Sequence, residues 1–279
     1  MIDLHVHTSY SDGRLSPTVI VEEAVRRGLG AVAITDHDVL GGLAEAKRAA
    51  PPGLEVVPGI EMTSRWEGAR AVHVLGYFVD PGDAGLNAAL RRGRQLMEQH
   101  VDRVLGAIRA TGGQLELGDL SRYRHRYAGG AALVLGMIER GVLRGAEPGT
   151  GMRLLRLAAA EPRAYDVAEA VRLIHGAGGV ASLAHPARLR RGQPLLEADA
   201  LAPLVELGFD AIEAWQWIPN GWGSEHYRRV AEELGVLVSG GSDDHGKRTR
   251  DGRMRLGAQP VPDTVLEPLR ERARARASA

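Results

Sequence analysis

Residues 3–13 of the chain read DLHVHTSYSDG. If residues 3–7 form a strand, alternate side chains share one face, so His5 and His7 point the same way. Two neutral imidazoles at a strand end, with the Asp12 carboxylate in the following loop, can begin a divalent metal site. A His-x-His pair alone is a weak signal, because core histidines often produce it. The pair gains weight here because further polar clusters follow other apolar runs.

Later apolar runs end in similar polar residues. They read AVAITDHD (31–38), LEVVPGIE (54–61), AVHVLGY (71–77), GVASLAHP (179–186) and VLVSGGSDDHG (236–246). Buried parallel strands typically appear as such continuous apolar runs. The carboxyl ends of these strands are where α/β barrels and open α/β sheets build their active sites. The repeated pattern therefore predicts an α/β fold with a functional site at one end of its sheet.

Helical patterns alternate with the first runs. Ser16-Pro17 is a typical helix start, with a capping hydroxyl and a proline in the first turn, and Gly28 ends that helix. A second helix is expected over 41–50, closed by Pro51-Pro52-Gly53. This β-α-β rhythm predicts a parallel sheet.

The rhythm changes after residue 85. Residues 86–164 contain no predicted strand that ends in a residue type able to bind a metal. Their patterns predict helices at 86–110, 130–140 and 152–160. We therefore predict a helical insertion over 86–164 within a discontinuous barrel formed by 1–85 and 165–279. The tail 267–277 is expected to be a surface helix or a frayed end.

These motifs together resemble those of the polymerase-and-histidinol-phosphatase (PHP) family of metal phosphoesterases. The resemblance spans residues 2 to about 246 and implies a distorted (β/α)7 barrel with a small helical insertion over its active-site face. The Asp12-Gly13 ending resembles the branch of nucleoside 3′,5′-bisphosphate phosphatases and short-RNA 5′-3′ exonucleases. Histidinol phosphatases and several other members tend to carry a histidine near that position.

The resemblance implies a cluster of two or three divalent ions. The first ion would be held by His5, His7, Glu61 and Asp243, the second by Asp12, His37 and His245, and the third by Glu61, His73 and His185. Nitrogen and oxygen ligands without sulfur suit Mn²⁺, Fe²⁺ or Zn²⁺. The oxygen ligand at Asp12 favours manganese, with iron and zinc as alternatives. In the implied mechanism, a hydroxide that bridges two ions attacks phosphorus.

Acidic residues beside the predicted metal ligands are expected to orient those ligands or to transfer a proton. Asp36 and Asp38 are expected to orient imidazoles from behind the ligands. Glu213 is either a third such residue or only a polar strand end. Asp244, or a nearby water, is expected to protonate the leaving oxygen.

Substrate contacts are predicted from arginines and tryptophans. Arg188 resembles an arginine at the same place in the bisphosphate-phosphatase branch, and its guanidinium can bind a phosphate through two hydrogen bonds. Arg124 and Arg126 belong to a basic patch in the insertion, where relatives carry an Arg-x-His unit instead. Trp217 and Trp222 are expected either to stack on a base or to pack as rim aromatics.

The composition of the chain limits the classes of protein to which it can belong. The 279 residues, 44% of them hydrophobic, suffice for one large core or a core with a small subdomain. The 35 basic and 35 acidic residues give no net charge, so the overall electrostatic potential does not indicate binding to nucleic acid or to a membrane. The absence of cysteine excludes disulfides and thiolate ligands. We expect a cytoplasmic protein without membrane segments, signal peptide or obligate protein partner.

Three functions remain open at this point. The first is a phosphomonoesterase that removes the 3′-phosphate of nucleoside 3′,5′-bisphosphates, and the second is a 5′-3′ exonuclease on short RNA. The third is an amidohydrolase that cleaves C–N bonds, a class that also opens with His-x-His on its first barrel strand. That class needs a bridging lysine on a middle strand, whereas the strand ends here carry Glu, His or Asp.

Overall fold

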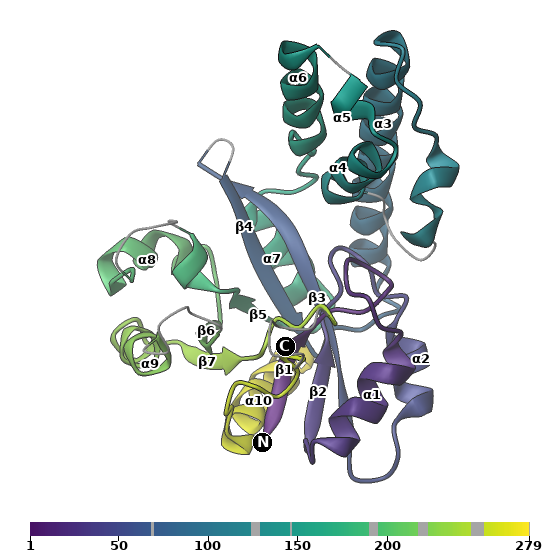
Figure 1. Cartoon of the computed structure of the whole chain (residues 1–279). Coiled ribbons are helices and arrows are strands. Elements are labelled where there is room, and N and C mark those ends of the chain that lie inside the picture. Colours follow the sequence, from purple (N-terminus) through teal and green to yellow (C-terminus); the bar gives the residue numbers. More distant parts are fainter. Residues whose placement is uncertain are drawn as a thin grey trace.

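A single curled sheet forms the centre of the molecule (Figure 1). The computed structural model describes residues 1–67, 70–123, 129–145, 147–189, 195–216, 223–246 and 254–278. Within these ranges, seven strands follow one another across the sheet in chain order. They are β1 (Ile2–Val6), β2 (Ala31–Ile34), β3 (Glu55–Trp66), β4 (Arg70–Tyr77), β5 (Val180–Leu183), β6 (Ala211–Trp215) and β7 (Leu237–Gly240).

The sheet is mixed rather than wholly parallel. Strands β1, β2 and β3 pair in parallel, as do β5, β6 and β7, but β4 is antiparallel to both β3 and β5. The parallel arrangement predicted from the β-α-β rhythm is therefore wrong at β4. The link between β3 and β4 covers only residues 67–69. A parallel connection needs about a dozen residues or more, so this link permits only an antiparallel return.

The segment after β7 connects the last strand to the first. The backbone N–H of His7 donates to the carbonyl of Asp244 at 2.9 Å, and the N–H of Asp243 donates to the carbonyl of His5 at 2.9 Å. These bonds bring the two ends of the curled sheet together at its carboxyl edge. The predicted α/β fold, a distorted seven-stranded barrel, is confirmed.

Helices cover the outside of the sheet. They are α1 (Pro17–Arg26), α2 (Leu43–Ala49), α7 (Val167–Gly176), α8 (Ala198–Val205), α9 (Gly223–Glu233) and α10 (Leu266–Ala277). The predicted helix start is confirmed, because the Ser16 hydroxyl accepts the N–H of Val19. The C-terminal segment is a packed helix rather than a frayed end, since Leu266 and Leu269 of α10 are buried in the main core.

A second group of helices extends away from the sheet (Figure 1). It contains α3 (Ala84–Ala110), a 3-10 helix (Leu117–Tyr123), α4 (Gly130–Glu139), α5 (Val142–Gly145) and α6 (Pro148–Ala159). The three helices predicted here are confirmed, while α5 and the 3-10 helix are additional. These helices bury a hydrophobic cluster of their own, in which Val104 of α3 packs with Leu133 of α4 and Ala158 of α6.

The first turns of α3 belong to the main core instead, through Leu86 and Leu90. One helix thus connects the sheet to the insertion. The division at 85/86 and 164/165 stays a prediction.

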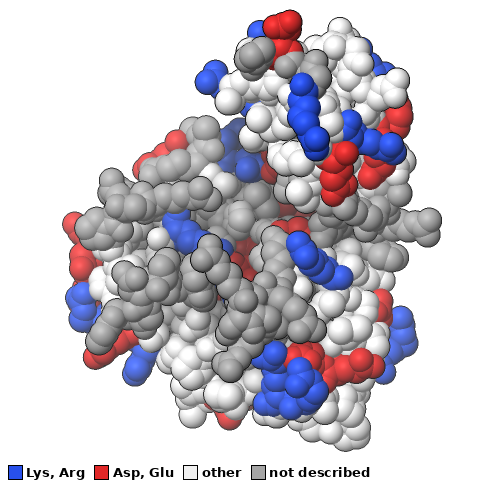
Figure 2. All heavy atoms as spheres, viewed as in Figure 1, with Lys and Arg blue, Asp and Glu red and all other residues white. Residues whose placement is uncertain are grey.

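The described surface carries charges of both signs. On the face shown in Figure 2, basic and acidic side chains are interspersed, in keeping with the equal totals of 35 basic and 35 acidic residues. Among the described helices, none has both the length and the apolar character needed to cross a lipid bilayer.

Candidate metal centre and adjoining cavity

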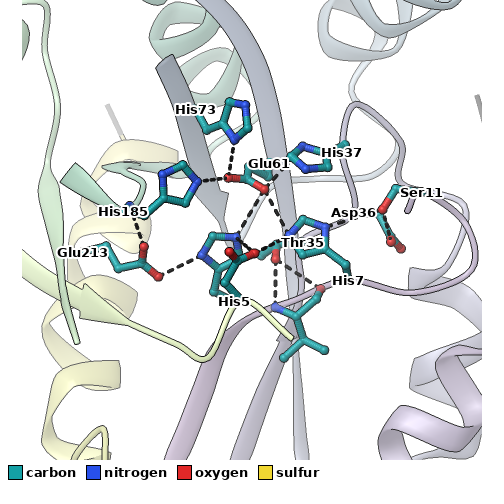
Figure 3. A network of polar contacts seen from close by, with 12 residues as sticks. His5, His7, Ser11, Thr35, Asp36, His37, Glu61, His73, His185 and Glu213 are labelled. Atoms are coloured by element: carbon teal, nitrogen blue, oxygen red, sulfur yellow. Dashed lines mark hydrogen bonds and ion pairs between the residues drawn. The ribbon is translucent and has the colours of Figure 1, made fainter. Parts of the chain in front are cut away.

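The first predicted ligand group converges on Glu61 (Figure 3). Both His5 and His7 direct Nε2 toward Glu61 Oε2, at 3.2 and 3.1 Å, so they share one face of β1 as strand alternation requires. Asp243, from the segment after β7, places Oδ1 3.2 Å from His7 Nε2. One potential ligand atom from each of these four residues lies within 4.8 Å of the others, a spacing compatible with a shared ion.

A second group surrounds Asp12. Its Oδ2 lies 3.0 Å from His245 Nε2, and its Oδ1 lies 4.0 Å from His37 Nε2. His7 also belongs to this group, since its Nδ1 is 3.6 Å from Asp12 Oδ1. The sequence-based grouping contained Asp12, His37 and His245 but not His7. His7 can therefore offer one ring nitrogen to each group.

The third group meets the other oxygen of Glu61. Both His73 Nδ1, at 2.9 Å, and His185 Nε2, at 3.0 Å, contact Glu61 Oε1. The compact set of potential ligand atoms on this side consists of His37, Glu61 and His73. Glu61 thus touches histidines from several strand ends, and it is the one residue common to the first and third groups.

The buried atoms of this cluster suit a cation. His5 Nε2, His7 Nε2 and Glu61 Oε2 are fully buried and have no hydrogen-bond partner among the described residues. Buried polar atoms rarely stay unpaired, so an unpaired donor set of imidazole nitrogen and carboxylate oxygen fits a divalent metal.

The electrostatics support the same interpretation. Burial raises the pKa of Glu61, but the charge of nearby histidines such as His5 prevails and holds it well below its usual range. Burial lowers the pKa of His37 to about 3, which keeps its imidazole neutral. Burial also lowers the pKa of His7, yet Asp243 and Glu61 raise it to about 10 overall. Ionised carboxylates and neutral imidazoles are the states that bind metals, and the attraction acting on His7 would act equally on a cation.

Glu213 links two of the predicted ligands. Its Oε1 lies 2.8 Å from His5 Nδ1, and its Oε2 accepts the backbone N–H of His185 at 2.6 Å. Because Nδ1 of His5 is occupied, Nε2 is the atom left to face the cluster. Through these contacts Glu213 can orient both residues, and that role stays a prediction.

Asp36 and Asp38 each contact a residue whose hydroxyl lies near a predicted ligand, and their orienting role stays a prediction. Asp36 accepts the Ser11 hydroxyl at 2.7 Å, and that oxygen lies 3.5 Å from His7 Nδ1. Asp38 accepts the N–H of Thr63 at 3.0 Å, and the Thr63 hydroxyl lies 3.4 Å from His37 Nδ1. Sequence reasoning missed both intermediaries. Thr63 lies two residues after Glu61 on β3, so strand alternation could have placed it on the same face.

The remaining predicted site residues are less directly connected to the cluster. Arg188 Nη1 donates to Asp243 Oδ2, which brings its guanidinium to the first ligand group. Asp244 is buried, and its Oδ1 accepts the N–H of Arg255 at 3.3 Å, so its role as proton donor stays a prediction. The predicted substrate contacts Arg124, Arg126, Trp217 and Trp222 lie outside the described residues.

A cavity of about 210 Å³ opens beside the second and third ligand groups. Its sheet side is lined by Ser11, Asp12, His37, Asp38, Thr63 and His73. Its insertion side is lined by Met97, Gly129, Ala132, Glu161, Pro162 and Arg163. The cavity therefore joins potential metal ligands to a wall from the helical insertion, and none of the insertion-side residues was predicted from the sequence.

Known proteins resemble this chain along most of its length. The PHP domain pattern matches residues 3–128. A 3′,5′-nucleoside bisphosphate phosphatase of Chromobacterium violaceum is 31% identical over 266 residues, covering 90% of each chain. A 5′-3′ exoribonuclease of Haemophilus influenzae is 32% identical, covering 87% of this chain and 89% of its own. The crystal structure of a metal-dependent phosphoesterase from Bifidobacterium adolescentis superposes with a TM-score of 0.77 at 27% identity, covering 97% of this chain and 96% of that one.

Proposed function

The chain belongs to the PHP family of metal-dependent phosphoesterases, and we propose that it removes the 3′-phosphate from nucleoside 3′,5′-bisphosphates. The observation that carries the proposal is the cluster centred on Glu61 beside a cavity bounded by the insertion. The phosphatase relative supports the substrate, since the similarity covers 90% of both chains.

Manganese is the proposed metal, with iron or zinc as alternatives and two or three ions in total. When bound, such ions would supply an activated water and would neutralise charge on the phosphate. The predicted ligands for them are His5, His7, Asp12, His37, Glu61, His73, His185, Asp243 and His245.

The protein side chains would position these ligands and the substrate. Glu213 holds His5 through Nδ1, and Thr63 approaches Nδ1 of His37. These contacts would fix the imidazoles before substrate arrives, which lowers the cost of reorganisation during reaction. Arg188 would exchange its bond to Asp243 for the equatorial oxygens of the phosphate.

A 5′-3′ exonuclease activity on short RNA is the second candidate. It is supported by the exoribonuclease relative at 32% identity. Both activities break a phosphate ester, so one site can serve both substrates. The amidohydrolase alternative has less support, because it needs a lysine at a strand end. The described residues contain one lysine, Lys47, which is exposed on helix α2 and not at a strand end.

Phosphate release in added Mn²⁺ tests the proposal. We would compare adenosine 3′,5′-bisphosphate, AMP and a 5′-phosphorylated RNA pentamer, with EDTA-treated protein as control. We expect a strong preference for the bisphosphate and loss of release in EDTA. Nucleotide release from the pentamer at similar efficiency would favour the exonuclease. The absence of product from all three substrates would contradict both candidates.

A further inference from the structure

The turn that follows β5 carries two residues of the predicted site, His185 and Arg188. It is a short 3-10 helix (Pro186–Arg188), and His185 before it has φ of 29° and ψ of 59°. Left-handed backbone at a residue other than glycine is uncommon and persists only where the surrounding structure holds it. A 3-10 helix of three residues supplies little of that restraint, because its hydrogen bonds are few and poorly aligned. Contacts from outside the turn must therefore hold it in this conformation.

Two side chains at the carboxyl end of β6 supply these contacts. Glu213 Oε2 accepts the backbone N–H of His185 at 2.6 Å. Gln216 Oε1 accepts the backbone N–H of Ala187 at 3.1 Å. The proline between these two donors has no N–H, and the N–H of Arg188 donates to the carbonyl of His185 at 2.8 Å. Of the three backbone donors in the turn, two therefore depend on side chains of the neighbouring strand.

The Gln216 amide is used at both ends. The residue is buried, and its Nε2 donates to the carbonyl of Glu213 at 2.8 Å while its Oε1 accepts from Ala187. One end of the amide is a donor and the other is an acceptor, so the two bonds fix its orientation. A carboxylate has no donor when ionised, and an apolar side chain makes neither bond. Gln216 thus fastens the middle of the turn to the end of β6.

Arg188 is the site residue whose position depends most on this contact. Its backbone follows Ala187 directly, whereas its side chain is 39% exposed and donates through Nη1 to Asp243 Oδ2. Because the guanidinium is partly exposed, packing does not fix it, and the position of its backbone decides which oxygens it reaches. A fixed backbone keeps the guanidinium beside the first ligand group and beside a phosphate bound there. Such preorganisation lowers the entropy that is lost when the phosphate binds.

We propose that Gln216 is a positioning residue that acts through Arg188 and so sets how tightly the site holds a phosphate. The inference rests on the proposed function, in which Arg188 contacts that phosphate. It assigns different effects to the two residues at the end of β6. Glu213 acts on two predicted metal ligands, whereas Gln216 acts on the guanidinium that follows one of them. Loss of the Gln216 amide therefore weakens phosphate binding without lowering the metal content.

The test is a double-mutant cycle in the full-length protein, with Gln216→Met, Arg188→Gln and the two changes combined. Methionine is unbranched and flexible like glutamine, but it makes neither of the two hydrogen bonds. Calorimetry on the Mn²⁺-loaded protein gives Kd for inorganic phosphate. The ratio kcat/KM is measured for p-nitrophenyl phosphate and for adenosine 3′,5′-bisphosphate, and the manganese content per chain is measured on the same samples.

We expect Arg188→Gln to weaken phosphate binding about 10- to 100-fold, because charge-assisted hydrogen bonds are lost. Gln216→Met alone should weaken it about 5- to 20-fold, since the guanidinium is present but no longer held in place. The double variant should match Arg188→Gln within about twofold, because Gln216 then has no guanidinium to act through. The ratio kcat/KM should fall in the same order, and manganese content should stay unchanged.

Asn87→Leu is the matched control. The Asn87 amide also makes two backbone bonds, to the carbonyls of Pro81 and Asp83, both at 2.8 Å. It lies at the start of α3 and outside the cavity lining. This variant should leave phosphate binding unchanged, alone and combined with Arg188→Gln. Circular dichroism checks the folding of each variant, and Gln216→Leu takes the place of Gln216→Met in the cycle if the methionine variant does not fold.

Three results would overturn the inference. Losses that add up in the double variant would mean that Gln216 affects the site independently of Arg188. A lower manganese content in Gln216→Met would mean that the amide maintains the metal ligands instead. An unchanged Kd for phosphate in that variant would exclude a positioning role. If phosphate binding shows the expected coupling but the wild-type protein does not hydrolyse the bisphosphate, the role of Gln216 stands and the proposed function fails.

Discussion

The Nδ1 atom of His5 lies 2.8 Å from Oε1 of Glu213, although the two residues are 208 positions apart in the chain. Both side chains are fully buried. The second Glu213 oxygen accepts the backbone N–H of His185, a residue with φ of 29° at the end of β5. Left-handed backbone at a residue other than glycine is uncommon and is found frequently at functional sites. One carboxylate therefore supports two predicted metal ligands on different strands.

Glu213→Gln should reduce metal affinity or hydrolysis about 10- to 100-fold, the range seen when such orienting partners are removed. The amide is nearly the same size as the carboxylate, but it carries no charge to hold His5 and can present only one oxygen. Metal content per chain and phosphate release at limiting Mn²⁺ measure the effect. Glu206→Gln, at an exposed position after α8, is the matched control. Unchanged metal content and rate would mean that Glu213 is only a polar strand end.

His37→Ala and Asp243→Asn should each lower hydrolysis at least about a thousandfold, because each removes a predicted ligand from a site that supplies several kcal/mol of charge stabilisation. Asparagine is chosen because Asp243 has φ of 52°, a backbone conformation that asparagine tolerates well. Phosphate release at saturating Mn²⁺ is the measurement, with circular dichroism to check folding.

The control for these two variants is His226→Ala. His226 Nε2 lies 2.8 Å from the carbonyl of Leu196, away from the cluster. This variant should keep its activity. Retention of activity by His37→Ala or Asp243→Asn in a folded protein would contradict the ligand assignment.

Thr63→Val should lower kcat about fivefold, in line with about 1 kcal/mol for a single neutral hydrogen bond. Valine has nearly the shape of threonine but cannot contact His37 Nδ1 through a hydroxyl. The effect should be smaller than that of Glu213→Gln, because the Thr63 contact is longer, at 3.4 Å, and His37 is partly exposed. Thr18→Val removes a comparable hydroxyl bond, to Glu45, between α1 and α2, and should leave kcat unchanged. A rate equal to wild type for Thr63→Val would exclude an orienting role.

Asp210 should make stability depend on pH in the acid range. Burial raises its pKa, but the hydrogen bond from His175, the N–H of Ala181 and the charge of Arg276 prevail and lower it. A lowered folded-state pKa gives stability that is present above the unfolded pKa of about 3.9 and is lost as pH falls through the folded value. Asp210→Asn should therefore destabilise the protein by about 1–3 kcal/mol at pH 7.

The difference between wild type and Asp210→Asn should shrink as pH falls below about 4, because Asp210 is protonated first in the unfolded chain and, at lower pH, in the folded protein. Urea unfolding at pH 7, 5 and 3 measures this difference. Asp263→Asn, at an exposed acidic residue that pairs with the N-terminal amine, is the control and should show little change. A destabilisation that stayed constant from pH 7 to pH 3 would mean that the charge of Asp210 is not responsible.

Residues close together in the chain carried most of the successful predictions. The helix start at Ser16 depends on a bond to Val19, three residues away, and the shared face of His5 and His7 depends only on strand alternation. These interactions are local, so their patterns can be seen in the sequence. The direction of β4, which was predicted wrongly, also has a local cause, because the link 67–69 is too short for a parallel return.

The sequence by itself determined the strand and helix types and the residue types available to bind a metal. Only the tertiary structure decided which of these residues meet. It joined Glu213 to His5, inserted Ser11 and Thr63 behind the histidines, and placed Arg163 and Glu161 in the same cavity as His73. The physical reason is that these contacts depend on how the curled sheet and the insertion pack together, and packing brings together side chains whose separation in sequence carries no periodic signal.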